Sequence, residues 1–288
     1  MKAKNAGLLQ IHVAVFLFGL SGLFGKLVTL PAGLIVFGRV VFASIFLILL
    51  LVYLRQNIKL NQQRHYVYLA VMGMLLAVHW VTFFLSIQVA TVAIGLLTFS
   101  TFPVFVTFLE PYFFKEKIRL ADIIAALLTL GGVILVIPEF QLNNSVTQGV
   151  VWGITSGFTY AVLSLLNRNF AAEYSSLVIA FYEQAAAAIL LFPFVFLRPQ
   201  PVVQVNDILL LLLLGVVFTG VSHSLFISGL KRIKTQTAGI ISSLEPVYGI
   251  IFAVMLLQEI PTLREILGGL IILGTVVYKS IDAGASSL

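Results

Sequence analysis

The chain contains ten apolar stretches, each long enough to cross the hydrocarbon core of a membrane as a helix. Such a crossing needs about 20 predominantly apolar residues. Only short loops remain between the stretches, and no soluble domain fits in them. The sequence therefore predicts an all-helical integral membrane protein. The ten predicted spans are 8–28, 34–54, 66–87, 91–113, 119–138, 148–167, 175–197, 206–228, 236–257 and 264–281.

The composition agrees with this class. Hydrophobic residues make up 60% of the chain and charged residues 10%, whereas soluble domains carry about 25% charged residues. This excludes a soluble enzyme, a nucleic-acid-binding domain and a disordered regulator. The chain has no cysteine, and it contains no phosphate-binding or dinucleotide-binding glycine motif. We therefore expect no cofactor, no metal site, no enzymatic activity and no ATPase of the chain's own.

The basic residues predict the orientation. The net charge of +6 would suggest a polyanionic partner in a soluble protein, but in a membrane protein lysine and arginine gather in cytoplasmic loops. If the N-terminus is cytoplasmic, only Lys26, Arg198 and Arg264 fall in external segments, and most other basic residues fall inside. Both termini are therefore expected in the cytoplasm.

The chain also repeats itself. A shift of 143 residues aligns Pro103 with Pro246, and a shift of 142 aligns Lys26 with Arg168. The predicted units are residues 1–140, with the first five helices, and 145–288, with the last five. Because five is odd, the second unit enters the membrane upside down. Inverted repeats are typical of secondary transporters, although a duplicated structural protein remains an alternative.

Three runs resemble a known family. They are FGKLVTLPAGLIVFGR (residues 24–39), TFPVFVTFLEPYFFKEKI (residues 101–118) and SSLEPVYGIIFAVMLLQEI (residues 242–260). They are similar to repeats of EamA-type proteins, bacterial members of the drug/metabolite transporter superfamily. The resemblance implies a ten-helix carrier of the cell inner (plasma) membrane with a central cavity. It implies small solutes as substrates, among them amino acids, nucleotide-linked metabolites and S-adenosylmethionine.

Glu245 is the leading candidate for a functional residue. It lies ten residues into the ninth span, at about 15 Å depth for a helical rise of 1.5 Å, and ionisable residues at such depth are expensive and often functional. Pro246 is expected to break the helix and free the carbonyl group of Ser242. Its repeat mate Pro103 is expected to free the carbonyl group of Phe99. Phe102 occupies the position equivalent to Glu245. Phe99, Phe102 and Ser242 are also expected to line the substrate-binding cavity.

Polar and aromatic stripes at helical spacing predict further walls of the cavity. An imidazole titrates near neutrality, so the two histidines are also candidate proton carriers. For each of these residues, ordinary packing inside a helix bundle is the alternative. The predicted wall residues are His79, Trp80 and Phe83 in the third span, Tyr160 in the sixth, and Ser222, His223 and Phe226 in the eighth.

Three other charged residues lie within the spans. Glu110 is a candidate gate or second proton site. Arg39 is a candidate for coupling or gating, although its long stem is expected to reach the outer interface. Glu183 occupies the roughly equivalent place in the second repeat and is expected to be mainly structural.

The favoured hypothesis is a secondary carrier in which Glu245 exchanges a proton for an amine-bearing substrate, most simply an exported amino acid. One alternative is uptake or exchange of S-adenosylmethionine or a nucleotide-like metabolite, and another is a non-transporting membrane scaffold. The expected partners are membrane lipid and a small-molecule substrate, without nucleic acid. Gly268, Gly269 and Gly274 allow close helix approach, in a homodimer or in internal packing.

Overall fold

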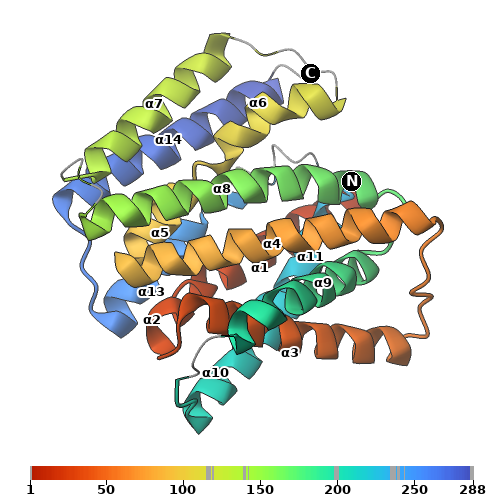
Figure 1. Cartoon of the computed structure of the whole chain (residues 1–288). Coiled ribbons are helices and arrows are strands. Elements are labelled where there is room, and N and C mark those ends of the chain that lie inside the picture. The colour runs from red at the N-terminus through yellow and green to blue at the C-terminus, as the bar shows by residue number, and fades with distance from the viewer. Residues whose placement is uncertain are drawn as a thin grey trace.

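The computed structural model of the chain is all-helical over the residues that it describes, and Figure 1 shows the arrangement. These are residues 2–114, 118, 120–138, 141, 143–197, 201–233, 238, 241–242 and 244–285. The first half of the chain forms α1 (Lys2–Ser21), α2 (Phe24–Leu27), α3 (Ala32–Tyr53), α4 (Gln63–Val89), α5 (Val92–Phe99), α6 (Phe102–Phe114) and α7 (Leu120–Val136). The second half forms α8 (Ser145–Phe170), α9 (Ser176–Phe196), α10 (Val205–Gly215), η1 (Val216–Val221), α11 (Ser222–Leu230), α13 (Glu245–Leu257) and α14 (Leu263–Ala285).

The structure confirms a helical membrane protein. Seven segments are long and apolar enough to cross a membrane, and each coincides with a predicted span. Two further apolar helices are shorter, Ile123–Val136 and Glu245–Leu257, so the count of ten crossings stays a prediction. The seven segments are Asn5–Leu27, Ala32–Tyr53, Gln63–Val89, Val92–Phe113, Ser145–Phe170, Ser176–Val195 and Val205–Leu230.

Side-chain caps fix where several of these helices begin. The Thr91 side chain accepts a hydrogen bond from the backbone of Ile94 at the start of α5. Asn144 caps α8 and Ser175 caps α9 in the same manner. Each cap satisfies a backbone N–H group that has no acceptor within the helix. Each of these three helices therefore begins directly after its capping residue.

The fourth and ninth predicted spans differ from continuous helices. The fourth consists of two helices, with α5 ending at Phe99 and α6 beginning one residue before Pro103. In the ninth, α13 begins at Glu245, so Pro246 lies in the first turn. Leu244, two residues before Pro246, lies in a turn, and the missing N–H group of Pro246 costs no hydrogen bond in the first turn, because first-turn N–H groups have no intrahelical acceptor. Glu245 therefore lies at a helix N-terminus.

The two halves of the chain make matching helix contacts. α1 packs on α11 and α13, as α8 packs on α4 and α6, while α3 packs on α10 as α9 packs on α4. A Cβ atom added at Gly73 would lie 2.7 Å from the carbonyl oxygen of Glu183, and one at Gly215 would lie 2.8 Å from that of Arg39. These two glycines therefore hold the backbones of Arg39 and Glu183 close against the other half of the chain.

The last helix packs inward. α14 lies along α7, in the upper part of Figure 1. A Cβ atom at Gly268 would meet the carbonyl oxygen of Gly132 at 2.6 Å, and one at Gly269 would meet Leu97 at 2.9 Å. Gly274 has open space around it. Two of the three glycines that the sequence offers for a dimer therefore serve internal packing.

Candidate functional site

A small buried cavity lies where α1, α4, α5, α8, α11 and α13 meet. Its volume is about 20 Å³, a little more than the roughly 10–15 Å³ that one water molecule needs. A metabolite enters this space only if the surrounding helices move apart. Seven of its nine lining residues are predicted from the sequence. The lining residues are Phe18, Ser21, His79, Trp80, Phe83, Phe99, Tyr160, His223 and Glu245.

Glu245 brings a carboxylate to the cavity wall. Its side chain is buried, and its position at the start of α13 follows from Pro246, which favours the first turn of a helix. α1 crosses this point so closely that a Cβ atom at Gly19 would lie 2.7 Å from the Glu245 carbonyl oxygen. No hydrogen bond to the Glu245 carboxylate comes from the described residues, so its oxygens are available to a ligand.

Arg39 lies inside the protein, and the expectation that it reaches the outer interface is wrong. Its guanidinium carbon is 3.8 Å from the centre of the Trp80 ring, and its Nε donates a 2.9 Å hydrogen bond to Thr219 Oγ1. The exposed fraction of Arg39 is 1%. The cation–π contact and the hydrogen bond replace the water that the charge would otherwise seek. Its Nη1 atom is buried without a partner among the described residues.

A local irregularity in the eighth span provides the hydroxyl group for Arg39. Residues 216–221 form the π-helical turn η1 between α10 and α11. Within it the Thr219 hydroxyl donates a 2.7 Å hydrogen bond to the Leu214 carbonyl oxygen. π-Helical turns within α-helices occur frequently at functional sites. Thr219 lies one helical turn before the predicted wall residues Ser222 and His223, but apolar periodicity does not predict the π-turn.

Glu183 and His223 form a pair that the sequence does not predict. Glu183 Oε2 lies 2.6 Å from His223 Nε2. Both side chains are buried, and Glu183 Oε1 has no partner among the described residues. The centre of the His223 ring lies 6.0 Å from that of Trp80. Arg39 and Glu183 lie in the second span of their respective halves. Each contacts a ring from the third span of its own half, Trp80 for Arg39 and His223 for Glu183.

His79 and Tyr160 form the wall contributed by α4 and α8. His79 Nδ1 lies 2.8 Å from Ser156 Oγ and 3.1 Å from the Ser156 carbonyl oxygen. The His79 and Tyr160 rings are 4.7 Å apart between centres. The Tyr160 hydroxyl is buried and has no partner among the described residues. This wall therefore offers a phenol that can hydrogen-bond to a bound molecule.

Four of the predicted wall residues do not line the cavity. Phe102 stacks on Phe99 with 5.3 Å between ring centres, and Phe226 contacts Phe18 and Tyr160 in the same layer. These rings support the lining residues from behind. Phe18 and Ser21 are not among the residues predicted from the sequence. The four that do not line the cavity are Phe102, Ser222, Phe226 and Ser242.

Two ion pairs lie at opposite ends of the helices. Lys26 Nζ is 3.8 Å from Glu259 Oε1 and donates a 2.9 Å hydrogen bond to the carbonyl oxygen of Ala90. Arg168 Nη1 is 2.7 Å from Glu110 Oε1. We call these the Lys26 end and the Arg168 end. Glu110 is thus an ion-pair partner remote from the cavity lining.

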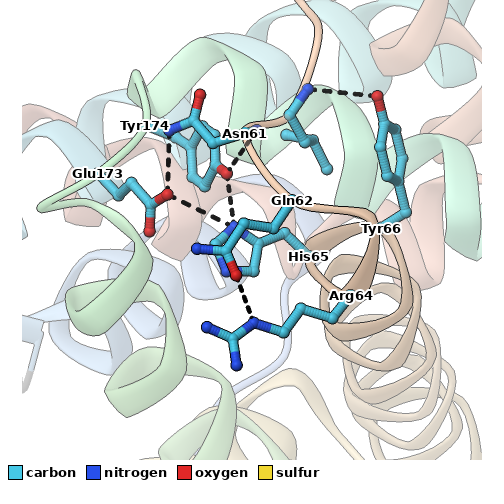
Figure 2. Close-up of polar contacts among 8 residues, drawn as sticks. Asn61, Gln62, Arg64, His65, Tyr66, Glu173 and Tyr174 are labelled. Carbon is cyan, nitrogen blue, oxygen red and sulfur yellow. Dashed lines mark hydrogen bonds and ion pairs between the residues drawn. The ribbon is translucent and has the colours of Figure 1, made fainter.

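The Arg168 end also carries a polar network around His65, shown in Figure 2. His65 Nδ1 lies 2.5 Å from the Tyr174 hydroxyl and 3.5 Å from Glu173 Oε1. Asn61 donates one hydrogen bond to Tyr174 and another to Glu173. The hydrogen bond from Asn61 is the main reason why the pKa of Glu173 lies below its usual value. The network joins the loop before α4 to the turn after α8.

The Lys26 end carries a corresponding polar contact. Asp207, in the first turn of α10, accepts hydrogen bonds from the backbone and hydroxyl of Thr29 at 3.0–3.1 Å. A shift of 142 residues places Asp207 on His65. At each end, a residue at the start of a helix therefore contacts a loop of the other half: His65 at the Arg168 end and Asp207 at the Lys26 end.

Buried charges around a cavity, within helices long enough to cross a membrane, are typical of membrane transport proteins. The chain belongs to the EamA-like transporter family, which matches residues 5–137 and again residues 147–280. This family is part of the drug/metabolite transporter superfamily. The resemblance expected from the sequence is confirmed, and the protein is a membrane transporter.

Two named transporters and one solved structure are similar to this chain. The uncharacterized transporter YxxF of Bacillus subtilis is 24% identical over 93% of this chain and 87% of its own length. An uncharacterized transporter of Archaeoglobus fulgidus is 29% identical over 67% of this chain and 68% of its own length. A solved crystal structure of another protein superimposes with a TM-score of 0.72 over 100% of this chain and 99% of that chain. At 18% identity, that likeness shows the fold alone.

Proposed function

We propose that the protein is a secondary transporter that carries small metabolites across the cell inner membrane by alternating access. In this proposal residues 1–140 and 145–288 are inverted five-helix repeats that rock about the cavity between them. The observation that carries the proposal is the buried cavity with the Glu245 carboxylate at its wall. The matching helix contacts of the two halves support it.

The proposed substrate carries an ammonium group, as amino acids and related metabolites do. Glu245 is the partner for that group, because its carboxylate lacks a hydrogen bond from the described residues. The faces of Trp80, Phe83, Phe99 and Tyr160 surround the same space and attract a cation through their π electrons. A substrate of this kind satisfies a buried charge that is otherwise costly in a membrane.

The two ion pairs at the ends are the proposed gates. Lys26 and Arg168 are repeat mates, and each binds a glutamate of the other half, Glu259 or Glu110. Opening toward one side breaks one pair and retains the other. This arrangement gives Glu110 the gating role considered from the sequence, while Arg39 positions the cavity wall through Trp80.

The proposed orientation places both termini and the Arg168 end in the cytoplasm, because most lysine and arginine residues lie in the segments on that side. A relative from Salmonella typhimurium, 28% identical over 56% of this chain and 55% of its own length, is named the uncharacterized inner membrane transporter YicL. Its name supports the same membrane here. Export of the substrate then runs from the Arg168 end to the Lys26 end.

The test is ligand-dependent thermal unfolding of the purified protein, followed by flux in proteoliposomes. The panel contains amino acids, nucleosides, S-adenosylmethionine and quaternary amines. A ligand at 100 times its Kd stabilises the folded state by about 2.7 kcal/mol. We expect amine-bearing ligands to stabilise the protein, and Glu245→Gln to remove that effect. Glu173→Gln, which alters a carboxylate outside the cavity, serves as the matched control and should retain it.

Two outcomes would count against the proposal. A ligand that stabilises Glu245→Gln as well as the unaltered protein moves the binding site away from this carboxylate. The absence of both stabilisation and flux over the whole panel favours a membrane scaffold, which would copurify with a fixed partner. A response to S-adenosylmethionine or nucleosides alone would instead replace amino acids by a nucleoside-like substrate.

A further inference from the structure

Glu183 and His223 form an acid–imidazole pair of which His223 belongs to the cavity wall. The exposed fractions of their side chains are 0% and 2%, and the facing oxygen and nitrogen atoms are 2.6 Å apart. His223 lines the cavity and Glu183 does not. We propose that this pair is a proton-binding site, at which one proton is exchanged for one cationic group of the substrate. The exchange rests on the transport function proposed above.

The charges around the cavity do not balance unless a proton or another cation is bound. Among the lining residues and their direct partners, Arg39 contributes one positive charge, and Glu183 and Glu245 contribute two negative charges. With both histidines neutral, the sum is one negative charge. A net charge in the interior of a membrane protein is expensive. One cation is therefore needed, and either a proton or an ammonium group supplies it.

The geometry favours His223 as the place where that proton is held. In the neutral pair, Nε2–H donates its hydrogen bond to Glu183 Oε2, and an added proton goes to Nδ1 of the same ring. The resulting imidazolium is neutralised by a carboxylate at hydrogen-bond distance. Glu183 Oε1 is buried without a partner among the described residues, so the anion depends on its neighbour for compensation.

Four other ionisable groups surround the pair, one from each of α3, α4, α8 and α13. His79 (α4), Tyr160 (α8) and Glu245 (α13) line the cavity together with His223. Arg39 (α3) lies over the ring of Trp80, whose centre is 6.0 Å from that of His223. Arg39 and Glu245 offset each other, and His79 is engaged by Ser156. The Glu183–His223 pair is thus the remaining group that can gain or lose a charge.

The exchange follows from this balance. When an ammonium group binds at Glu245, a protonated pair would leave the cavity with one excess positive charge. The proton on His223 Nδ1 therefore leaves to water on the side to which the cavity is open. After release of the substrate on the other side, a proton from that side returns to the same nitrogen. The cycle moves one proton against one cationic group, in opposite directions.

The test uses Trp80 and needs no substrate. The chain has two tryptophans, so Trp152→Phe leaves Trp80 as the single fluorophore, 6.0 Å from His223. An imidazolium quenches tryptophan fluorescence more strongly than a neutral imidazole does. We expect a reversible fluorescence transition of the purified Trp152→Phe protein between about pH 5 and pH 9, the range in which histidines titrate.

Variants in the same background assign that transition. Glu183→Gln should move its midpoint to lower pH by at least about one unit, a tenfold loss of proton affinity. His223→Gln should abolish it, whereas His79→Gln should retain it. Glu173→Gln, which alters the other glutamate–histidine pair, His65–Glu173, is the matched control and should leave the midpoint unchanged.

The proposal is overturned by a Trp152→Phe protein without any transition, or by a transition that persists in both Glu183→Gln and His223→Gln. The second variant covers the case in which the first does not fold. Either failure would leave ligand binding at Glu245 intact. Conversely, a normal titration together with a protein that binds and moves nothing would remove the transport proposal and retain the proton site.

Discussion

The two halves of the protein place opposite charges at corresponding positions. In the first half, Arg39 on α3 lies over the ring of Trp80 on α4. In the second half, Glu183 on α9 binds the ring of His223 on α11. The backbones around Arg39 and Glu183 are held by glycines, Gly215 and Gly73, that are themselves repeat mates. The two halves therefore share the packing of their backbones, but they carry different ionisable side chains at the centre.

This difference shows what duplication retains and what it leaves free. Packing of backbone on backbone tolerates little beyond glycine, so both halves keep the same geometry. The side chains at the centre face each other and need only balance in charge. The cavity is therefore asymmetric: one half holds a fixed cation, because guanidinium stays protonated, and the other holds a carboxylate paired with an imidazole.

Removing one central charge at a time should affect the two halves of the protein most unequally. Arg39→Gln leaves two buried carboxylates and no fixed cation, whereas Glu183→Gln leaves Arg39 and Glu245 in balance. Losing one partner of a buried charge pair typically destabilises a protein by about 3–5 kcal/mol. We expect Arg39→Gln to lower the free energy of unfolding by about that amount and Glu183→Gln by clearly less. Denaturant unfolding in detergent at pH 8 measures both.

The control for this prediction is Thr219→Val, which removes only the hydroxyl that binds Arg39 Nε. It should be milder than Arg39→Gln, at about 1–3 kcal/mol for a buried donor left unpaired. Equal losses for Arg39→Gln and Glu183→Gln would contradict the charge balance and with it the asymmetry of the halves.

The sequence predicts the framework better than it predicts the centre. Apolar stretch length places seven membrane helices. Seven of the nine lining residues are predicted, five of them as polar or aromatic residues at helical spacing and two, Glu245 and Phe99, from their depth or from a nearby proline. Arg39 is misplaced, because its reach toward Trp80 depends on how α3 packs on α4. The Glu183–His223 pair is missed for the same reason. Its two members are 40 residues apart in the chain, and no local pattern joins them.

The two ends of the molecule provide a second comparison, through access to the cavity. The chain has no native cysteine, so Ser21→Cys places a single thiol at the cavity wall. Arg168→Gln breaks the Arg168–Glu110 pair and should speed labelling by a membrane-impermeant thiol reagent about tenfold, which corresponds to about 1.4 kcal/mol, from the side that the proposed orientation makes cytoplasmic. Lys26→Gln should do so from the outside instead.

Inverted and right-side-out vesicles separate the two directions. Lys26 is 28% and Glu259 25% exposed, and their atoms are 3.8 Å apart, whereas Glu110 is 8% exposed and bonded at 2.7 Å. Because a solvated pair contributes less, we expect the smaller change for Lys26→Gln. Equal acceleration from both sides in either variant would mean loosening of the whole protein and would argue against separate gates.

The smallest effect is expected from the network of Figure 2. The pKa of Glu173 is lowered from its usual value of 4.5, mainly by the hydrogen bond from Asn61. A carboxylate with a lowered pKa contributes stability above that usual value and loses it as the pH falls through the lowered pKa. We therefore expect Glu173→Gln to lower the Tm by less than about 2 °C near pH 7. The difference between variant and unaltered protein should shrink steadily below pH 4.5.

Asn61→Ala tests the cause of that pH dependence. Without the donor, the pKa of Glu173 should return toward 4.5, and the Tm difference caused by a further Glu173→Gln exchange should fall at every pH. A difference that grows as the pH falls would instead assign the effect to His65, whose protonation adds a positive charge 3.5 Å from the carboxylate. The Arg168 end would then depend on an imidazole, whereas Asp207 occupies the corresponding position at the Lys26 end.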